Sequence, residues 1–118
     1  MDVWDHPRPP AGVITIEREG SDRCVLCLRG DVDTAVATQF TANQRREQVV
    51  VDAIDAEGVT FMSSSALALL VKAVEASTAA GRHPVLRAAS HQVDRALRLA
   101  GIEDVFSRPE PGPPPSPS

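Results

Sequence analysis

Between Val49 and Val74 the chain passes from a continuous apolar run, through a cluster of three serines, to apolar residues at helical spacing. The run from Val49 to Asp55 is typical of a central buried strand. The apolar residues after the serines recur on one helix face: Leu67, Leu70, Val71 and Val74. A strand that leads directly into a helix favours an α/β fold, and any one of the three serines can cap that helix. Hydroxyls at a helix N-terminus also suit a reversible negative charge, so this place favours a switch over a catalyst.

Length and composition narrow the function classes. The chain has 118 residues, which corresponds to one domain, and only 3% of them are aromatic, so the core must be aliphatic. The formal net charge of −4 argues against a nucleic-acid surface, which needs clustered basic residues. The sequence has no run of about 18 apolar residues and no secretory signal pattern at its start, so we expect a cytoplasmic protein without a membrane span.

Strand and helix patterns alternate along the rest of the chain. Val13 to Glu17 alternates apolar and polar residues, and a turn at Gly20-Ser21-Asp22 joins it to a second strand over Cys24 to Arg29. We expect Gly30 to Thr34 to break that strand and to cap a short helix through Phe40.

The C-terminal half is predicted from similar signals. We expect a helix from about Ser64 to Ala80, closed by Gly81, and a short strand over Val85 to Ala88. Ser90 should cap a helix that Gly101 ends, and a final strand is allowed around Val105. The fold class is therefore a single α/β domain with a four- to five-stranded mixed sheet and three main helices, in the order β-β-α-β-α-β-α-(β). Residues 1–12 are predicted to be a flexible arm, residues 13–108 the domain, and residues 109–118 a proline-rich disordered tail.

Three patterns that would indicate catalysis or metal binding are incomplete. Cys24 and Cys27 form a C-x-x-C that suggests a redox or zinc site, but residues three apart in a strand point to opposite faces, which favours two small buried side chains. The chain has no G-x-G-x-x-G and no Walker sequence, so a nucleotide enzyme is not expected. Without a G-x-S-x-G elbow, a triad built from Ser64 and His91 is disfavoured.

Three segments in order resemble a known family. Val51 to Leu67 resembles the signature of STAS domains, the sulphate-transporter and anti-sigma-antagonist fold, in which Val-Thr-Phe and an aliphatic residue precede Asp-Ser-Ser/Thr-Gly-Leu. Gly30-Asp31-Val32-Asp33 is similar to the family's step before its first helix. Val93 to Ile102 resembles its last helix and the turn that follows. The similarity covers roughly residues 13–108.

The resemblance implies a partner-binding module without enzyme activity, cofactor or metal. It implies an anti-sigma factor antagonist, which binds an anti-sigma factor, often a serine kinase, and so frees a sigma factor. In this family, phosphorylation of the serine after the motif's Asp abolishes binding, and a serine phosphatase restores it. By position the phosphoacceptor is Ser64. The other positions carried over as partner-binding are Asp31, Asp33, Thr34, Met62, Ser63, Ser65 and Ala66.

The sequence departs from the family pattern at two positions. Ser63 replaces the acid, which alters recognition by a kinase, and Ala66 replaces a glycine, which is favourable if this residue lies in the first helical turn. Two alternatives to the switch follow from the same resemblance: a binder that is never phosphorylated, and an accessory subunit of a lipid-transport ATPase complex. Asp33 either contacts a partner or assists phosphotransfer, or it is the N-cap of the first helix. Leu99, off the apolar stripe of its helix, is expected to be exposed.

Overall fold

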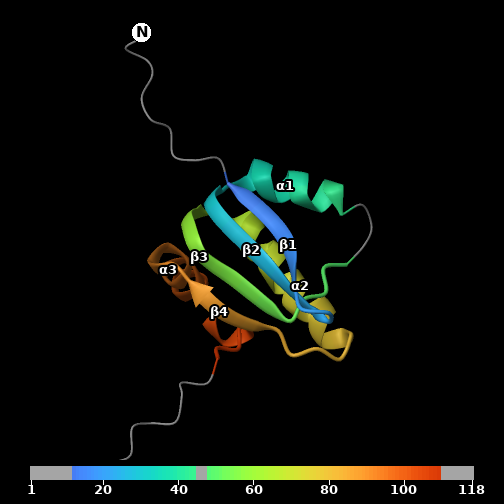
Figure 1. Ribbon diagram of the computed structural model, residues 1–118. Coiled ribbons are helices and arrows are strands. Elements are labelled where there is room, and N and C mark those ends of the chain that lie inside the picture. The colour runs from blue at the N-terminus through green and yellow to red at the C-terminus, as the bar shows by residue number, and fades with distance from the viewer. Residues whose placement is uncertain (1–11, 45–47, 110–118) are drawn as a thin grey trace, which may run out of the picture.

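The computed structural model describes residues 12–44 and 48–109 (Figure 1). Its helices and strands are, in chain order, β1 (Val13–Glu19), β2 (Arg23–Val32), α1 (Thr34–Asn43), β3 (Ala53–Met62), α2 (Ser64–Ala79), β4 (Val85–Ala89), α3 (His91–Ala100) and the 3-10 helix η1 (Glu103–Val105). The strands form one sheet in the order β1-β2-β3-β4, in which β1 and β2 are antiparallel and the other pairs are parallel. This confirms the predicted α/β class, mixed sheet and element order. The predicted arm and tail lie outside the described residues, except for Gly12 and Pro109.

The final strand that the sequence permits around Val105 does not form. Residues around Val105 form the 3-10 helix η1. Among the described residues that follow it, the strand-like pairing is limited to an isolated bridge between Ser107 and Val85. Gly101 ends α3 with φ at 69°, and Ser90 caps its start by accepting a hydrogen bond from the N–H of Val93. Both ends of this helix confirm the prediction, because they depend on local capping chemistry.

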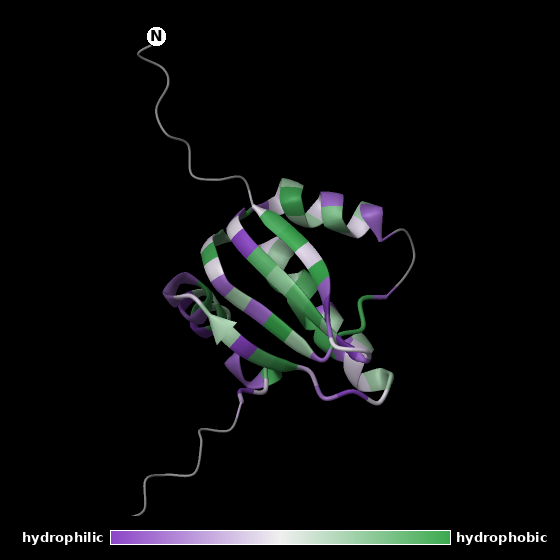
Figure 2. Cartoon of the chain, viewed as in Figure 1, coloured by the Kyte–Doolittle hydropathy of each residue, from purple (hydrophilic) through white to green (hydrophobic). Residues whose placement is uncertain are grey.

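The three helices pack against one face of the sheet. Side chains from all of them join one core with the inward residues of the strands, including Phe40 from α1, Leu70 from α2 and Leu97 from α3. Figure 2 shows the strands from their other face, on which a small separate cluster of Val25, Cys27 and Ala53 is buried. The sheet is therefore covered by helices on one side, and the elements that follow β2 and β3 all lie on that side.

The predicted bounds of β2 and β3 are wrong. The run from Val49 to Asp52 precedes the strand, and β2 continues through Gly30 to pair Val32 with Met62. Two register shifts in the β2–β3 pairing accommodate extra residues of β3, the second of them at Thr60. Bulges of this kind occur beside functional sites because they redirect side chains and bend the strand. In this sheet, β2 and β3 both extend beyond their predicted ends, Arg29 and Asp55.

Backbone and side-chain hydrogen bonds both hold the segment before β3, and the N–H of Asp52 donates to the carbonyl of Cys24 at 2.8 Å. The N–H of Val51 donates to the hydroxyl of the buried Ser77 at 2.8 Å. The carboxylate of Asp52 accepts from the N–H of Cys24 at 2.9 Å and from Arg82 at 2.8 Å. The start of β3 is therefore tied to β2, to α2 and to the loop before β4.

The two cysteines are free and lie on opposite faces of the sheet, as predicted. Cys27 packs with Val25 and Ala53, whereas Cys24 packs against the main core. Burial and a hydrogen bond to Glu17 raise the pKa of the Cys27 thiol to about 11, which keeps it protonated at neutral pH.

Within residues 12–44 and 48–109, no group of three or more metal-ligating side chains is found. None of the helices in these ranges has the length and apolar character that a membrane span requires.

Candidate functional site

The serine cluster lies where β3 ends and α2 begins. Ser63 is the N-cap: its backbone is extended, and its hydroxyl accepts a hydrogen bond from the N–H of Ala66 at 3.1 Å. Ser64 and Ser65 are the first two residues of α2, and both are exposed. One serine therefore caps the helix, and the other two carry hydroxyls that a modifying protein can reach.

The loop between β2 and α1 lies beside this cluster. The N–H of Ser63 donates to the carbonyl of Val32 at 3.0 Å, so the carboxyl ends of the parallel strands β2 and β3 are joined where their helices start. Asp33 is the N-cap of α1, and its carboxylate accepts from the N–H of Val36 at 2.9 Å. Thr34 follows it as the exposed first residue of α1. Of the two roles considered for Asp33, the capping role is confirmed.

Asp31 is held by a neighbouring strand. Its carboxylate accepts a hydrogen bond of 2.7 Å from the hydroxyl of Thr60, the extra residue of β3 at the second register shift. Asp31 is half-buried and Asp33 is exposed. The site thus brings together two carboxylates, an exposed threonine and two exposed serine hydroxyls at the starts of α1 and α2. No histidine in the described part hydrogen-bonds to Ser64.

Two residues carried over from the family as partner-binding are core residues in this chain. Met62 is 8% exposed, and Ala66 is fully buried. Met62 ends β3 on the inward face and Ala66 lies in the first turn of α2, so both side chains pack in the core, and their contact with a partner stays a prediction. The expectation that alanine is accommodated inside the helix is confirmed.

Phe61 is a further candidate residue that the sequence patterns do not single out. This side chain is 50% exposed, whereas Phe40 and Phe106 are buried in the core. Phe61 pairs with Asp31 across the sheet, directly after the register shift at Thr60. Because alternation counted from Val59 places Phe61 on the inward face, only the bulge turns it outward. An exposed aromatic residue three positions before Ser64 is a natural contact for a partner.

The arrangement suits reversible acquisition of negative charge. The amides of Ser64 and Ser65 have no protein acceptor among the described hydrogen bonds, as expected for the first turn of a helix. Such amides and the helix dipole bind anions. A phosphoryl group on Ser64 would find donors at hand without a change in the fold.

A comparison with known protein families matches residues 14–113 to the STAS domain. The matched range contains nearly all of the described elements, including the whole serine site. A search of curated proteins found no match.

Proposed function

Because this chain belongs to the STAS domain family, we propose that it is an anti-sigma factor antagonist of the cytoplasm that acts by binding and not by catalysis. Its partner is an anti-sigma factor of the serine-kinase type, and binding frees a sigma factor. Phosphorylation of Ser64 ends the binding, and a serine phosphatase restores it. The observation that carries the proposal is the exposed Ser64 hydroxyl at the start of α2, beside the start of α1.

The free protein should tolerate a phosphate at this place. Ser63 already satisfies the N–H of Ala66, and the amides of Ser64 and Ser65 remain to donate to phosphate oxygens. Negative charge at a helix N-terminus is stabilised by about 0.3–2 kcal/mol. The fold therefore loses little when Ser64 is modified.

A complex with the partner should not tolerate a phosphate on Ser64. Phosphorylation adds a charge of about −1.5 to −2, which would have to be desolvated against the partner. Asp33, exposed at the neighbouring helix start, adds like-charge repulsion. A loss of about 2.8 kcal/mol lowers affinity a hundredfold. The switch thus depends on the difference between a small cost in the free protein and a large one in the interface.

The replacement of the family's acid by Ser63 favours a second candidate, a binder that is never phosphorylated. The Ser63 hydroxyl caps α2 as a carboxylate would, so the fold does not require the acid. What is missing is a negative charge beside the acceptor, which a kinase can use for recognition. The two candidates share a binding surface and differ only in whether Ser64 is modified.

The test is a phosphorylation assay on the full chain. The protein is incubated with ATP and with purified anti-sigma kinases of the histidine-kinase ATPase fold, one at a time, and phosphate is mapped by mass spectrometry. Label on Ser64 is expected in wild type and in Ser65→Ala, and none in Ser64→Ala. A kinase that binds the chain tightly but never labels it would contradict the switch and support the constitutive binder. Tight binding to a transporter ATPase, with none to any kinase, would contradict the anti-sigma role.

A further inference from the structure

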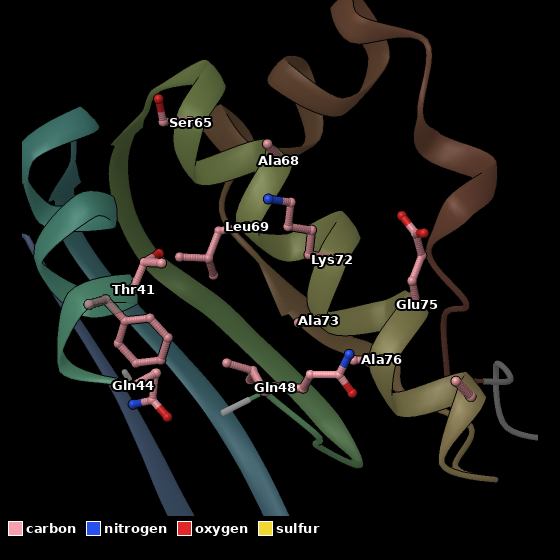
Figure 3. A pocket seen from close by; sticks show the side chains of 13 residues that line it. Thr41, Gln44, Gln48, Ser65, Ala68, Leu69, Lys72, Ala73, Glu75 and Ala76 are labelled. Carbon is pink, nitrogen blue, oxygen red and sulfur yellow. The ribbon is translucent and has the colours of Figure 1, made fainter. Parts of the chain in front are cut away.

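A groove of about 770 Å³ runs between α1 and α2 (Figure 3). Its origin lies in the lengths of the two helices. They begin side by side, but α1 has 10 residues and α2 has 16, so α2 extends past the end of α1. The flank of α2 from Ser65 to Ala79 lines the groove. At 1.5 Å per residue this flank is about 21 Å long.

The floor of the groove is apolar. Phe40 contributes from α1, Leu69, Ala73 and Ala76 from α2, and Val49 from the segment before β3. The alanines leave room because their side chains end at Cβ. Small-molecule sites in proteins typically have volumes of about 300–1,000 Å³ and a mainly apolar lining with few polar groups. The volume of the groove falls within that range, and its lining is mixed: Thr41, Gln44, Gln48, Ser65, Lys72 and Glu75 surround the apolar floor.

Among the described residues that line the groove, one is a cation. Lys72 is the only lysine of the chain, and its side chain lines the groove from the α2 flank. Among the described residues, no carboxylate lies within 4.0 Å of its ammonium group. Figure 3 shows this ammonium directed along α2 towards the Ser65 end, whereas the carboxylate of Glu75 extends on the side away from α1. An apolar floor with a cation on one side complements a ligand that has an aliphatic chain and an anionic head.

We propose that the α1–α2 groove binds a small amphipathic anion, a free medium-chain carboxylate. Its chain lies along Leu69, Ala73 and Ala76, and its carboxylate pairs with the Lys72 ammonium. The four methylenes of Lys72 lie over the apolar wall while the charged end meets the head group. This inference is independent of the phosphorylation of Ser64, since none of the groups it uses takes part in that switch.

The probe is dodecanoate, titrated below its micellar concentration into the isotope-labelled full chain and followed by amide chemical shifts. Saturable shifts are expected along α2 at Leu69, Ala73 and Ala76. Lys72→Gln should weaken dodecanoate binding about fivefold, the size expected for an exposed ion pair. The same variant should bind neutral dodecanol as wild type does, because only the head group contact is removed.

Steric and surface variants complete the experiment. Ala76→Trp should fill the groove and abolish binding of both compounds, and Leu69→Ala, which removes floor contacts, gives an independent test if the tryptophan variant does not fold. Leu99→Ala removes a side chain 77% exposed on α3 and should change nothing. Absence of saturable shifts, shifts spread over the whole surface, or equal dodecanoate binding by wild type and Lys72→Gln would overturn the proposal. So would co-sedimentation with anionic lipid vesicles without binding of monomeric dodecanoate, which would assign the face to a bilayer.

Discussion

The N–H of Ser63 donates a 3.0 Å hydrogen bond to the carbonyl of Val32, and this bond joins the loops that start α2 and α1. Each loop then caps its own helix, through the Ser63 hydroxyl and the Asp33 carboxylate. The exposed first residues of both helices therefore share one surface. A charge added to Ser64 changes that whole surface and not a single side chain.

Ser63→Ala should destabilise the domain by about 1 kcal/mol, because the N–H of Ala66 loses its acceptor. Ser63→Asp should retain wild-type stability, since a carboxylate caps equally well. Urea unfolding of the two variants and wild type checks this. Ser65→Ala is the matched control and should change the free energy of unfolding by less than about 0.5 kcal/mol. Equal losses in Ser63→Ala and Ser65→Ala would show that the cap contributes nothing.

Ser77→Ala should cost about 1–3 kcal/mol, because it leaves the N–H of the fully buried Val51 without its acceptor. Thr78→Ala, one residue further on the exposed side of α2, is the control with little expected effect. The free energy of unfolding in urea distinguishes them. A Ser77→Ala protein as stable as Thr78→Ala would mean that the segment before β3 is held by other contacts.

The free energy of unfolding should fall in acid, partly because Asp52 becomes protonated. Hydrogen bonds from Arg82 and from the N–H of Cys24 hold the pKa of Asp52 below its ordinary value of 3.8. A lowered folded-state pKa contributes stability above the unfolded value, and this contribution is lost as the pH falls through the folded value. Wild type should therefore lose more stability than Asp52→Asn between about pH 4 and pH 2. Urea midpoints against pH measure this; parallel curves for wild type and Asp52→Asn would refute it.

Phe61→Ala should leave the fold nearly intact but weaken partner binding. In the free protein this side chain is half exposed, so its removal costs little core contact. In a complex, an aromatic side chain buried by the partner contributes about 2 kcal/mol or more, which is roughly thirtyfold in affinity. Titration calorimetry with the kinase identified by phosphorylation gives the affinity. Leu99→Ala, which removes an exposed side chain near the end of α3, should bind as wild type does. Equal affinities for Phe61→Ala and wild type would exclude this face from the interface.

Local chemistry made much of the fold predictable from the sequence. Ser90 and Gly101 mark the ends of α3 through capping and positive φ, and the apolar spacing after Ser64 gives α2. The bounds of β3 were not predictable, because Val49 and Val51 pack in the core before the strand begins.

The same limit applies to the site. The hydroxyl cluster and Asp33 are visible as cap residues, since capping depends on neighbours in sequence. The exposure of Phe61 and the burial of Met62 depend on a register shift against β2, which one strand's sequence does not reveal. The groove beside α2 depends on the relative lengths of two helices far apart in the chain.

The most direct measurement compares one partner's affinity for two forms of this protein that differ only at Ser64. The kinase is titrated with unmodified protein and with protein carrying stoichiometric phosphate on Ser64, in the absence of ATP. We predict at least a hundredfold weaker binding of the phosphorylated form, with similar urea midpoints for the two free proteins. Equal affinities, or a phosphorylated form that is itself unfolded, would contradict it.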